Sequence, residues 1–446
     1  MPGYGRHEFT WGVGVATLRA SQTTECAAAE CAATLRSRDH AEGYVASVCF
    51  KTGPPRLIGV ELEWTVHDDT DPTRAVPPAR LAQALGPHAP RTLNPDSPHH
   101  PLPCGGLITV EPGGQVEIST PPSDSLHRLL TATDADQAQL VGLLSASGLV
   151  LGDAGTDAHR APRRIIDTPR YAAMQAAFDG AGPHGTTMMC STAGLQVCLD
   201  AGEPDRVASR WAALHALGPV LLATFANSPR LAGDASGWAS TRMRTWYGTD
   251  PTRTRPVGVS ADPAATWARY AMRANLLVLR RPADDWRAPT GVTFGDWVCG
   301  LTDNWMRELP PHPPTTDDLD YHLHTLFPPV RPRGYLEVRY LDAQPGNGWA
   351  APVAVLAALF AAEQTVDAAL ELAAPAADRW VQAARHGLAD PVVARAAAGV
   401  LDLAGTALDD TDLTPRQRAT VAETLSRRLA QAETLSRRSR ERKAAP

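Results

Sequence analysis

The sequence contains few cysteines, and they do not form a disulfide framework or a metal-binding motif. The 446 residues include 7 cysteines, an odd number, and no pair has the CxxC spacing of a zinc site or a redox pair. We therefore expect reduced thiols and a cytoplasmic protein. For Cys198 we predict a small packing residue, because no histidine is placed in the sequence to activate its thiol.

Targeting signals, membrane spans and an excess of one charge are also missing. The N-terminal residues lack the apolar core of a signal peptide, and no uncharged run is long enough to predict a membrane span. With 48 acidic and 42 basic residues the formal charge is -6, which gives no reason to expect a nucleic-acid partner. We expect small-molecule substrates, no membrane partner, and a monomer or weak homo-oligomer.

Glycine-rich phosphate-binding motifs are absent as well. The sequence has no GxxxxGK[ST] segment and no GxGxxG segment before a helix, so Walker-type and Rossmann phosphate sites are excluded. If the protein handles phosphate, metal ions and side chains have to bind it.

Polar and apolar residues alternate in four segments that we expect to be strands. In the segment 58–64, apolar residues alternate with Glu61 and Glu63, so a strand there has one apolar face and one face with two carboxylates. The same alternation surrounds Glu117, Gln196 and Glu337. If these strands are neighbours in one sheet, their carboxylates share a face and repel one another. The pattern predicts a positively charged ligand on that face.

The other segments favour a mixed α+β fold, in which helices pack on an antiparallel sheet, over a doubly wound fold. Helices are expected at about 17–35, 124–147, 171–178 and 205–225, strands at 149–151 and 187–199, and a hairpin over 106–119. The segment 240–255 carries four arginines and predicts an anion-binding loop. We divide the chain into an N-terminal helical segment packed on the body (1–56), a catalytic core (57–350) and an Ala-rich helical region with a basic tail (351–446).

The polar residues of the predicted strands suit a divalent cation and a phosphate. The candidate metal ligands, which offer only oxygen atoms and so favour Mg²⁺ or Mn²⁺ over structural zinc, are Glu61, Glu63, Glu111, Glu117, Gln196 and Glu337. Arg339 shares a strand face with Glu337, and arginines beside carboxylates are typical of phosphate sites. A single such strand is more often a solvated face, but four repeats favour a metal site. Arg242, Arg253 and Arg339 could instead be surface ion-pair partners, an alternative that we favour for Arg253 but not for Arg339.

Five motifs resemble the type 2 glutamate-cysteine ligase family. They are the segments 108–119, 188–200, 225–229, 249–254 and 327–339, which occur in this order between Leu57 and Trp349. The chain is most similar to the branch of the family that serves ergothioneine biosynthesis. The resemblance implies a glutamine-synthetase-like curved antiparallel sheet with one polar active-site face.

The resemblance also implies roles for individual residues. It assigns metal binding to the six candidate ligands, catalysis to Arg339 and Glu61, and ATP contacts to Gln196 and Arg339. Substrate or phosphate binding falls to Arg242 and, by a weaker match, Arg253. Two positions depart from the plant-type enzymes: Cys198 stands where these usually have Asn, and Pro329 where they have Glu.

The implied reaction joins the γ-carboxylate of L-glutamate to L-cysteine with ATP and Mg²⁺, through a γ-glutamyl phosphate. The sequence does not identify the base that deprotonates the amine. A ligase that activates glutamate for a different amine, a metal-dependent phosphohydrolase and a non-catalytic nucleotide sensor remain alternatives, although the near-complete set of ligands argues against the sensor.

Overall fold

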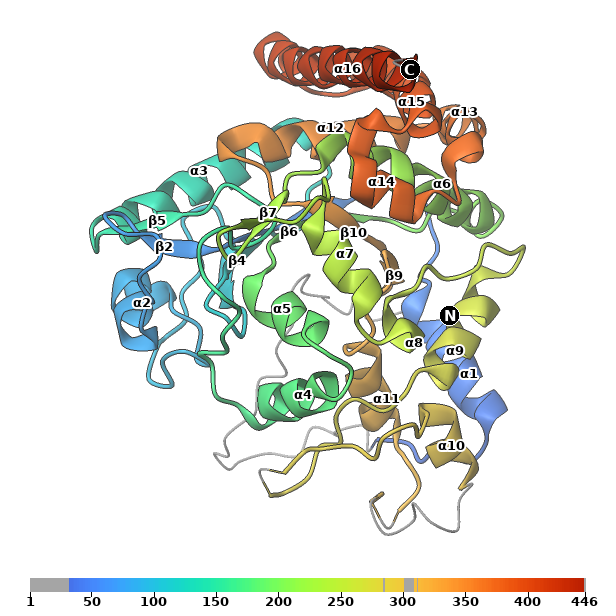
Figure 1. The fold of residues 1–446 in the computed structure, drawn as a ribbon. Coiled ribbons are helices and arrows are strands. Elements are labelled where there is room, and N and C mark those ends of the chain that lie inside the picture. Colours follow the sequence, from blue (N-terminus) through green and yellow to red (C-terminus); the bar gives the residue numbers. More distant parts are fainter. Residues whose placement is uncertain (1–31, 284, 301–308, 311, 445–446) are drawn as a thin grey trace, which may run out of the picture.

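A six-stranded antiparallel sheet lies at the centre of the protein (Figure 1). The computed structural model describes residues 32–283, 285–300, 309–310 and 312–444, so most of the helix predicted at 17–35 lies outside the described residues. The strand order is β3-β4-β1-β6-β10-β9, and each neighbouring pair is antiparallel. The strands are β1 Ile58–Trp64, β3 Leu107–Val110, β4 Val116–Ser119, β6 Gly194–Leu199, β9 Val330–Pro332 and β10 Leu336–Asp342. The predicted α+β class is confirmed.

The register of these strands places the predicted polar residues on one face. Glu63 is paired with Glu117, Glu61 with Gln196, and Glu337 with Cys198. Residues directly opposite each other in an antiparallel pair point to the same side of the sheet. The prediction that these four strands are neighbours with a shared polar face is therefore correct.

β10 contains one extra residue relative to β6. Val338 is paired with Val197, but the next pair is Leu341 with Leu195, so the register shifts between them. After such a bulge the alternation of faces is reversed. Asp342, paired with Gly194, thus lies on the same face as Glu337.

Helices cover both faces of the sheet (Figure 1). On the apolar face pack α3 (Leu126–Ser145), α6 (Val207–Phe225) and α12 (Ala350–Leu359). α6 is buried nearly all round, because it also supports the C-terminal helices on its other side. On the polar side lie α4 (Pro169–Asp179), α5 (His184–Ser191) and α7 (Thr241–Gly248).

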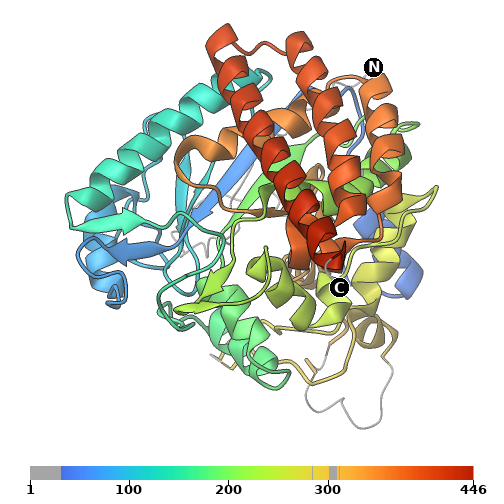
Figure 2. The same ribbon diagram turned by 45° about the horizontal axis from the view of Figure 1, so that its top comes forward.

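The C-terminal region is helical, as predicted, and packs on α6 (Figure 2). It contains α13 Glu363–Ala373, α14 Trp380–His386, α15 Pro391–Ala407 and α16 Pro415–Ala444. By length and apolar composition, one helical stretch, Pro391–Asp410, could cross a membrane, and so could the bent pair Gly346–Leu359 and Glu363–Ala376 together. The sequence analysis did not anticipate this. α15 buries one face against α6, α12 and α13, which is typical of a helix inside a protein core.

The remaining elements surround this frame. They are α1 Arg38–Cys49, which packs on α9 Pro263–Arg273, then β2 Val66–Asp68 paired with β5 Leu149–Leu151, α2 Pro78–Leu85, β7 Arg230–Leu231, β8 Asp234–Ala235, α8 Pro251–Thr254, α10 Phe294–Cys299 and α11 Thr316–Leu323. The buried apolar side chains form one packed hydrophobic core, whose members range from Leu35 to Leu425 in the sequence. The division at residues 56 and 350 stays a prediction.

Two predicted elements were wrong. The segment 187–199 is not a single strand, because α5 continues to Ser191 before β6 begins at Gly194. The segment 240–255 is not a loop but contains α7 and α8. Each of these helices has an N-cap: the Ser240 hydroxyl accepts from Met243 N, and the Asp250 carboxylate accepts from Thr252 N.

Candidate functional site

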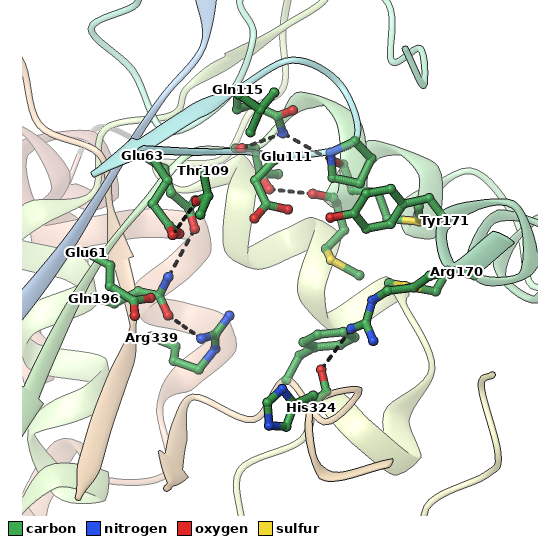
Figure 3. A pocket seen from close by; sticks show the side chains of 18 of the residues that line it. Glu61, Glu63, Thr109, Glu111, Gln115, Arg170, Tyr171, Gln196, His324 and Arg339 are labelled. Carbon is green, nitrogen blue, oxygen red and sulfur yellow. Dashed lines mark hydrogen bonds between the residues drawn. The ribbon is translucent and has the colours of Figure 1, made fainter. Parts of the chain in front are cut away.

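A cavity of about 150 Å³ lies between the polar face of the sheet and the helices α4 and α5 (Figure 3). Its polar lining includes Glu61, Glu63, Thr109, Glu111, Gln115, Glu117, Arg170, Tyr171, Gln196, His324, Arg331, Arg333 and Arg339. Its less polar lining includes Met174, Met188, Met189, Trp246 and Phe327. The cavity therefore has a carboxylate-rich floor and an arginine-rich edge.

The floor carries negative charge that nearby cations only partly offset. Burial, together with the neighbouring Glu337 carboxylate, raises the pKa of Glu61 to about 7. Burial and Glu63 raise the pKa of Glu111 to about 7. Burial, then Glu61, Glu63 and Glu111, raise the pKa of Glu117 well above its usual range. Each shift has the sign expected for carboxylates that are crowded together away from water.

Hydrogen bonds fix the orientation of two of these carboxylates. Glu117 Oε1 accepts from the hydroxyls of Thr109 (2.8 Å) and Ser119 (3.0 Å). Glu63 accepts from the backbone N of Gly194 at 2.6 Å and from Gln196 Nε2 at 3.1 Å. These bonds leave further carboxylate lone pairs for a ligand in the cavity.

Glu337 has a different environment, because arginines surround it. Arg331 donates to both of its oxygens, at 2.7 and 3.1 Å, and Arg339 Nη1 donates to Oε2 at 2.8 Å. Arg333 lies 3.8 Å from Oε1. Burial alone would raise the pKa of Glu337, but the three arginines hold it well below its usual range. The carboxylate of Glu337, a predicted metal ligand, is thus ionised, and the arginines already offset its negative charge.

Arg339 connects the arginine edge to the carboxylate floor. Its Nη1 donates to Glu337 and also to Gln196 Oε1, while Gln196 Nε2 donates to Glu63. Arg339 Nε is buried and has no hydrogen-bond partner among the described residues. The predicted pair Gln196 and Arg339 therefore lies in the centre of the site, with a donor that a ligand could engage.

The two arginines predicted to bind substrate lie behind the site. Within the described ranges, the lining of the cavity includes neither Arg242 nor Arg253. Arg242 Nη2 donates to the carbonyl oxygen of Arg339 at 2.9 Å, and its guanidinium lies 4.7 Å from the ring centroid of Trp246. Arg253 is fully buried and bonds Asp250, Thr325 and Asn275. In this geometry Arg242 supports the strand that carries Arg339, and Arg253 is held by buried hydrogen bonds; the substrate-binding role of both stays a prediction.

The residues present fit a divalent cation. Glu61, Glu63, Glu111 and Glu117 supply oxygen atoms only. Burial, and then neighbouring carboxylates, raise the pKa values of Glu61, Glu111 and Glu117, and a bound cation would offset the repulsion among these carboxylates. Among the residues that the structure describes, Glu61, Cys198 and Glu337 also have ligand atoms within 4.8 Å of one another. Burial, with Glu61 and Glu337, raises the pKa of the Cys198 thiol well above its usual range. A neutral thiol is a poor Mg²⁺ ligand, so Cys198 is better described as packing, as predicted.

Sequence reasoning missed several lining residues. Arg331 lies opposite Glu337 in the β9–β10 hairpin, a register that the Gly334 turn could have indicated. Arg170 and Tyr171 begin α4, at the end of a segment rich in arginine and proline. His324 follows α11 and lines the cavity.

A second cavity of about 780 Å³ adjoins the first. The two share His324 and Arg333 in their linings. Its other walls include Tyr44, Val48 and Cys49 of α1, Leu57 before β1, Asp200 after β6, and Tyr335 before β10. This space is more apolar than the carboxylate cavity, and Arg333 lies at the junction.

Comparison with known proteins identifies the family. Residues 57–441 match the model of glutamate-cysteine ligase family 2. The chain belongs to this family. It is 42% identical over 353 residues to the glutamate--cysteine ligase EgtA of Mycobacterium tuberculosis, with 78% of each chain covered. It is 41% identical over 358 residues to EgtA of Mycolicibacterium smegmatis, covering 79% of this chain and 81% of that protein.

More distant glutamate-cysteine ligases are also similar. The chloroplastic enzyme of Arabidopsis thaliana is 30% identical over 292 residues, which cover 64% of this chain and 54% of that one. A crystal structure of glutamate-cysteine ligase from Francisella tularensis in complex with AMP has a TM-score of 0.51 at 14% identity, covering 87% of this chain and 83% of that one. At this identity the likeness concerns the fold alone. The matches confirm the predicted family and enzyme class and agree with the predicted ergothioneine branch.

Proposed function

We propose that this member of glutamate-cysteine ligase family 2 makes γ-glutamylcysteine from L-glutamate, L-cysteine and ATP for ergothioneine biosynthesis, acting in the cytoplasm as a monomer or weak homo-oligomer. The observation that carries the proposal is the cavity in which the carboxylates of β1 and of the β3–β4 hairpin, with the Gln196 amide of β6, face Arg339 and Arg331. The carboxylates would bind the metal ions that carry the ATP phosphates. The arginines would stabilise the negative charge of the transferring phosphoryl group.

Mg²⁺, or Mn²⁺, fits the floor of the cavity. Glu61, Glu63, Glu111 and Glu117 would hold it, with Gln196 and Glu337 as further ligands once ATP and substrate reorganise their bonds to Arg339. Bound there, the metal supplies Lewis-acid neutralisation of the ATP phosphates. The chain's own residues then orient the two reacting groups.

We place the adenosine part of ATP in the second cavity. Its walls are largely apolar and include Tyr335 and Leu57, and its junction with the carboxylate cavity is formed by Arg333 and His324. The phosphates of a nucleotide bound in this position would extend past Arg333 to the carboxylates of the first cavity. A Val48→Trp substitution fills this cavity from α1 and should raise the KM for ATP without raising the KM for glutamate. Val381→Trp, at an exposed position in α14, is the matched control.

In the first step the γ-carboxylate oxygen of glutamate attacks the γ-phosphorus of ATP, and the bond to ADP breaks. Arg339 and Arg331 line the cavity and would stabilise the negative charge that develops on the transferring group. In the second step the cysteine amine attacks the acyl carbon of γ-glutamyl phosphate, loses its proton and expels inorganic phosphate. Arg242, by holding the carbonyl of Arg339, is a positioning residue for both steps.

The test is ADP release by the purified protein with Mg-ATP and glutamate, with and without cysteine, together with the mass of the product. We expect ADP release that requires both amino acids and yields γ-glutamylcysteine. If another amine replaces cysteine, the ligase acts on a different acceptor. If ADP is released without glutamate, the proposal is overturned in favour of a phosphohydrolase.

A further inference from the structure

We infer that a third cavity, behind the turn of the β3–β4 hairpin, is a regulatory site for a small monocarboxylic acid with an apolar body. The cavity has a volume of about 470 Å³ and is lined by Gly113 and Gly114 of the turn, whereas Glu111 beside them lines the carboxylate cavity. An acid bound there would hold the turn and strengthen cation binding at Glu111. The binding does not depend on the proposed function, whereas the effect on the cation rests on the metal site proposed with it.

Much of the lining of this third cavity is apolar. It includes Val66, Ala75, Val76, Pro77, Leu81 and Ile165. Val66, Val76 and Leu81 are buried, whereas Ala75 and Pro77 are exposed, so the cavity has an apolar base and a rim in contact with solvent. A molecule whose apolar part displaces water from this base is bound by the hydrophobic effect.

The charged side chains of the lining leave one positive charge without a partner. They are Asp157, Arg160, Arg163 and Arg164. Arg160 is paired with Asp157 at 2.8 Å, and Arg164 with Asp167 at 2.7 Å. Within the described part of the chain, Arg163 has neither an ion pair nor a side-chain hydrogen bond. One guanidinium without a counterion matches one carboxylate, which it can bind in a bidentate geometry.

The N-terminus of α2 adds partial positive charge to the same cavity. Pro77, which is the N-cap of α2 and lines the cavity, makes no side-chain hydrogen bond to the first turn of the helix. The helix dipole places partial positive charge at this end. Together with Arg163, it favours an anion over a neutral or a cationic ligand.

Hydrogen bonds connect the walls of this cavity to Glu111. Ile165 N donates to Pro112 O at 2.8 Å, and Gly114 N donates to Glu111 O at 2.8 Å. A Cβ on Gly114 would lie 2.7 Å from Ile165 Cδ1, so the turn and the segment that follows Arg163 are closely packed. A ligand in contact with both would restrain the turn. A ligand that favours this position of Glu111 strengthens cation binding, and the cation strengthens ligand binding by the same factor.

Calorimetric titration of the metal-free protein with 3-phenylpropionate tests the site. We expect saturable binding with a Kd of roughly 0.1–1 mM. 3-Phenylpropanamide has the same body without the charge, and acetate has the charge without the body; each should bind at least roughly 10-fold more weakly. Binding of the amide as tight as that of the acid, or no saturation by the acid below about 10 mM, would overturn the site. Tighter binding of phenyl phosphate, a dianion, would overturn the assignment to a single carboxylate.

Two variants locate the binding in this cavity. Arg163→Gln removes the guanidinium, and Ala75→Trp fills the cavity from its rim; both positions are exposed, so both proteins should fold. We expect each variant to weaken binding of 3-phenylpropionate roughly 10-fold or more. Arg395→Gln, exposed in α15, and Val381→Trp, exposed in α14, are the matched controls and should bind like the unchanged protein. Binding in Arg163→Gln or Ala75→Trp equal to that of its control would overturn the location.

A second titration, with MgCl₂, tests the coupling to Glu111 without turnover. We expect saturating 3-phenylpropionate to lower the Kd for Mg²⁺ roughly 3- to 10-fold in the unchanged protein. Arg163→Gln, at the same concentration of the acid, should show less of this effect because it binds the acid more weakly. An unchanged Kd for Mg²⁺ in the presence of bound acid would overturn the regulatory role.

These outcomes can be told apart from failure of the proposed function, because neither titration contains ATP or an amino acid. If both titrations succeed but the protein releases no ADP with glutamate and cysteine, the proposed function fails and the site stands. If turnover is as expected but 3-phenylpropionate does not bind, the function stands and the site is wrong.

Discussion

Glu63 of β1 lies directly opposite Glu117 of β4 in the antiparallel pairing of the central sheet. Two carboxylates in this relationship repel each other, and burial strengthens the repulsion because little water is present to screen it. The sheet therefore contains a pair that costs stability in the free enzyme. The cost is removed when a cation binds between the strands or when a proton does.

Removing one charge of this pair should stabilise the free enzyme and remove its activity. Glu117→Gln keeps an oxygen to accept from Thr109 and Ser119 but ends the repulsion. We expect the free energy of unfolding without metal to rise by about 1 kcal/mol. We expect γ-glutamylcysteine formation to fall roughly 100-fold or more, because a proposed metal ligand is lost.

Thermal unfolding with and without MgCl₂ checks this expectation. The unchanged enzyme should be stabilised by MgCl₂ and the variant much less so, because a ligand that binds only the folded state adds to stability. Glu371→Gln, at an exposed position in α13, serves as the control. A variant with lower stability than the unchanged protein in metal-free buffer would contradict the repulsion.

The bidentate pair of Arg331 with Glu337 should contribute strongly to folding. Arg331→Met leaves the fully buried Glu337 with fewer cations, and breaking a buried pair from one side costs about 3–5 kcal/mol. Urea unfolding followed by circular dichroism measures this loss. The matched control, Arg74→Met, removes an exposed partner of Asp68 and should cost less than about 1 kcal/mol. Equal losses in the two variants would refute the argument.

A methyl group at Gly113 should distort the turn that carries Glu111. A Cβ at this position would lie 2.1 Å from the carbonyl oxygen of Cys190 in α5, so the hairpin or the helix has to move. We expect Gly113→Ala to reduce kcat while the protein still folds. Gly142→Ala is the control: its Cβ has no neighbour within 4 Å, and alanine inside α3 should add about 0.5–1 kcal/mol of stability. Full activity of Gly113→Ala would show that the turn tolerates displacement.

His322 should make the protein less stable as the pH falls. Burial, and then Arg253, lowers the pKa of His322 to about 3, while the imidazole Nε2 lies 3.0 Å from the carbonyl oxygen of Ala271. Because the unfolded value is about 6.5, the unfolded chain binds the proton first. The contribution is complete above about pH 6.5 and is lost as the pH falls towards the folded value, by about 1.4 kcal/mol per pH unit.

Urea unfolding at several pH values between about 7.5 and about 5 tests this slope. His322→Gln should have a slope smaller by about 1.4 kcal/mol per pH unit. His386→Gln, at an exposed position at the end of α14, should keep the slope of the unchanged protein. An unchanged slope in His322→Gln would mean that this imidazole does not titrate differently in the two states.

The sheet and its polar face could be predicted from the sequence because alternation is a local signal. Glu61, Gln196 and Glu337 each lie between apolar neighbours, and the physical rule for strands places them on one side. The motif resemblance added the order of reaction steps. The contacts between strands, such as Arg331 with Glu337, could not be predicted in this way, because they depend on which strands pair and in which register.

Secondary structure was predicted wrongly where a segment is buried on all sides, because its sequence then lacks the alternation of polar and apolar residues. Met188, Met189 and Cys190 are apolar in succession because α5 is enclosed by neighbouring elements, and such a run does not distinguish a helix from a strand. The role of Arg242 in binding substrate or phosphate, which the motif resemblance implied, stays a prediction. The place of Arg242 on the inner side of α7 follows from tertiary packing, which the sequence does not display.

The extra residue in β10 determines how relatives of this protein should be aligned and redesigned. Before it, Glu337 and Arg339 lie on the polar face of the sheet; after it, Asp342 lies on this face and accepts from Asn227 N and from the hydroxyls of Ser228 and Ser240. A single deletion between Val338 and Leu341 would turn Asp342 into the hydrophobic core and release the loop that leads to α7. Insertions and deletions in related sequences should therefore be rare between Val338 and Leu341. A design that grafts β10 into another protein has to include the extra residue.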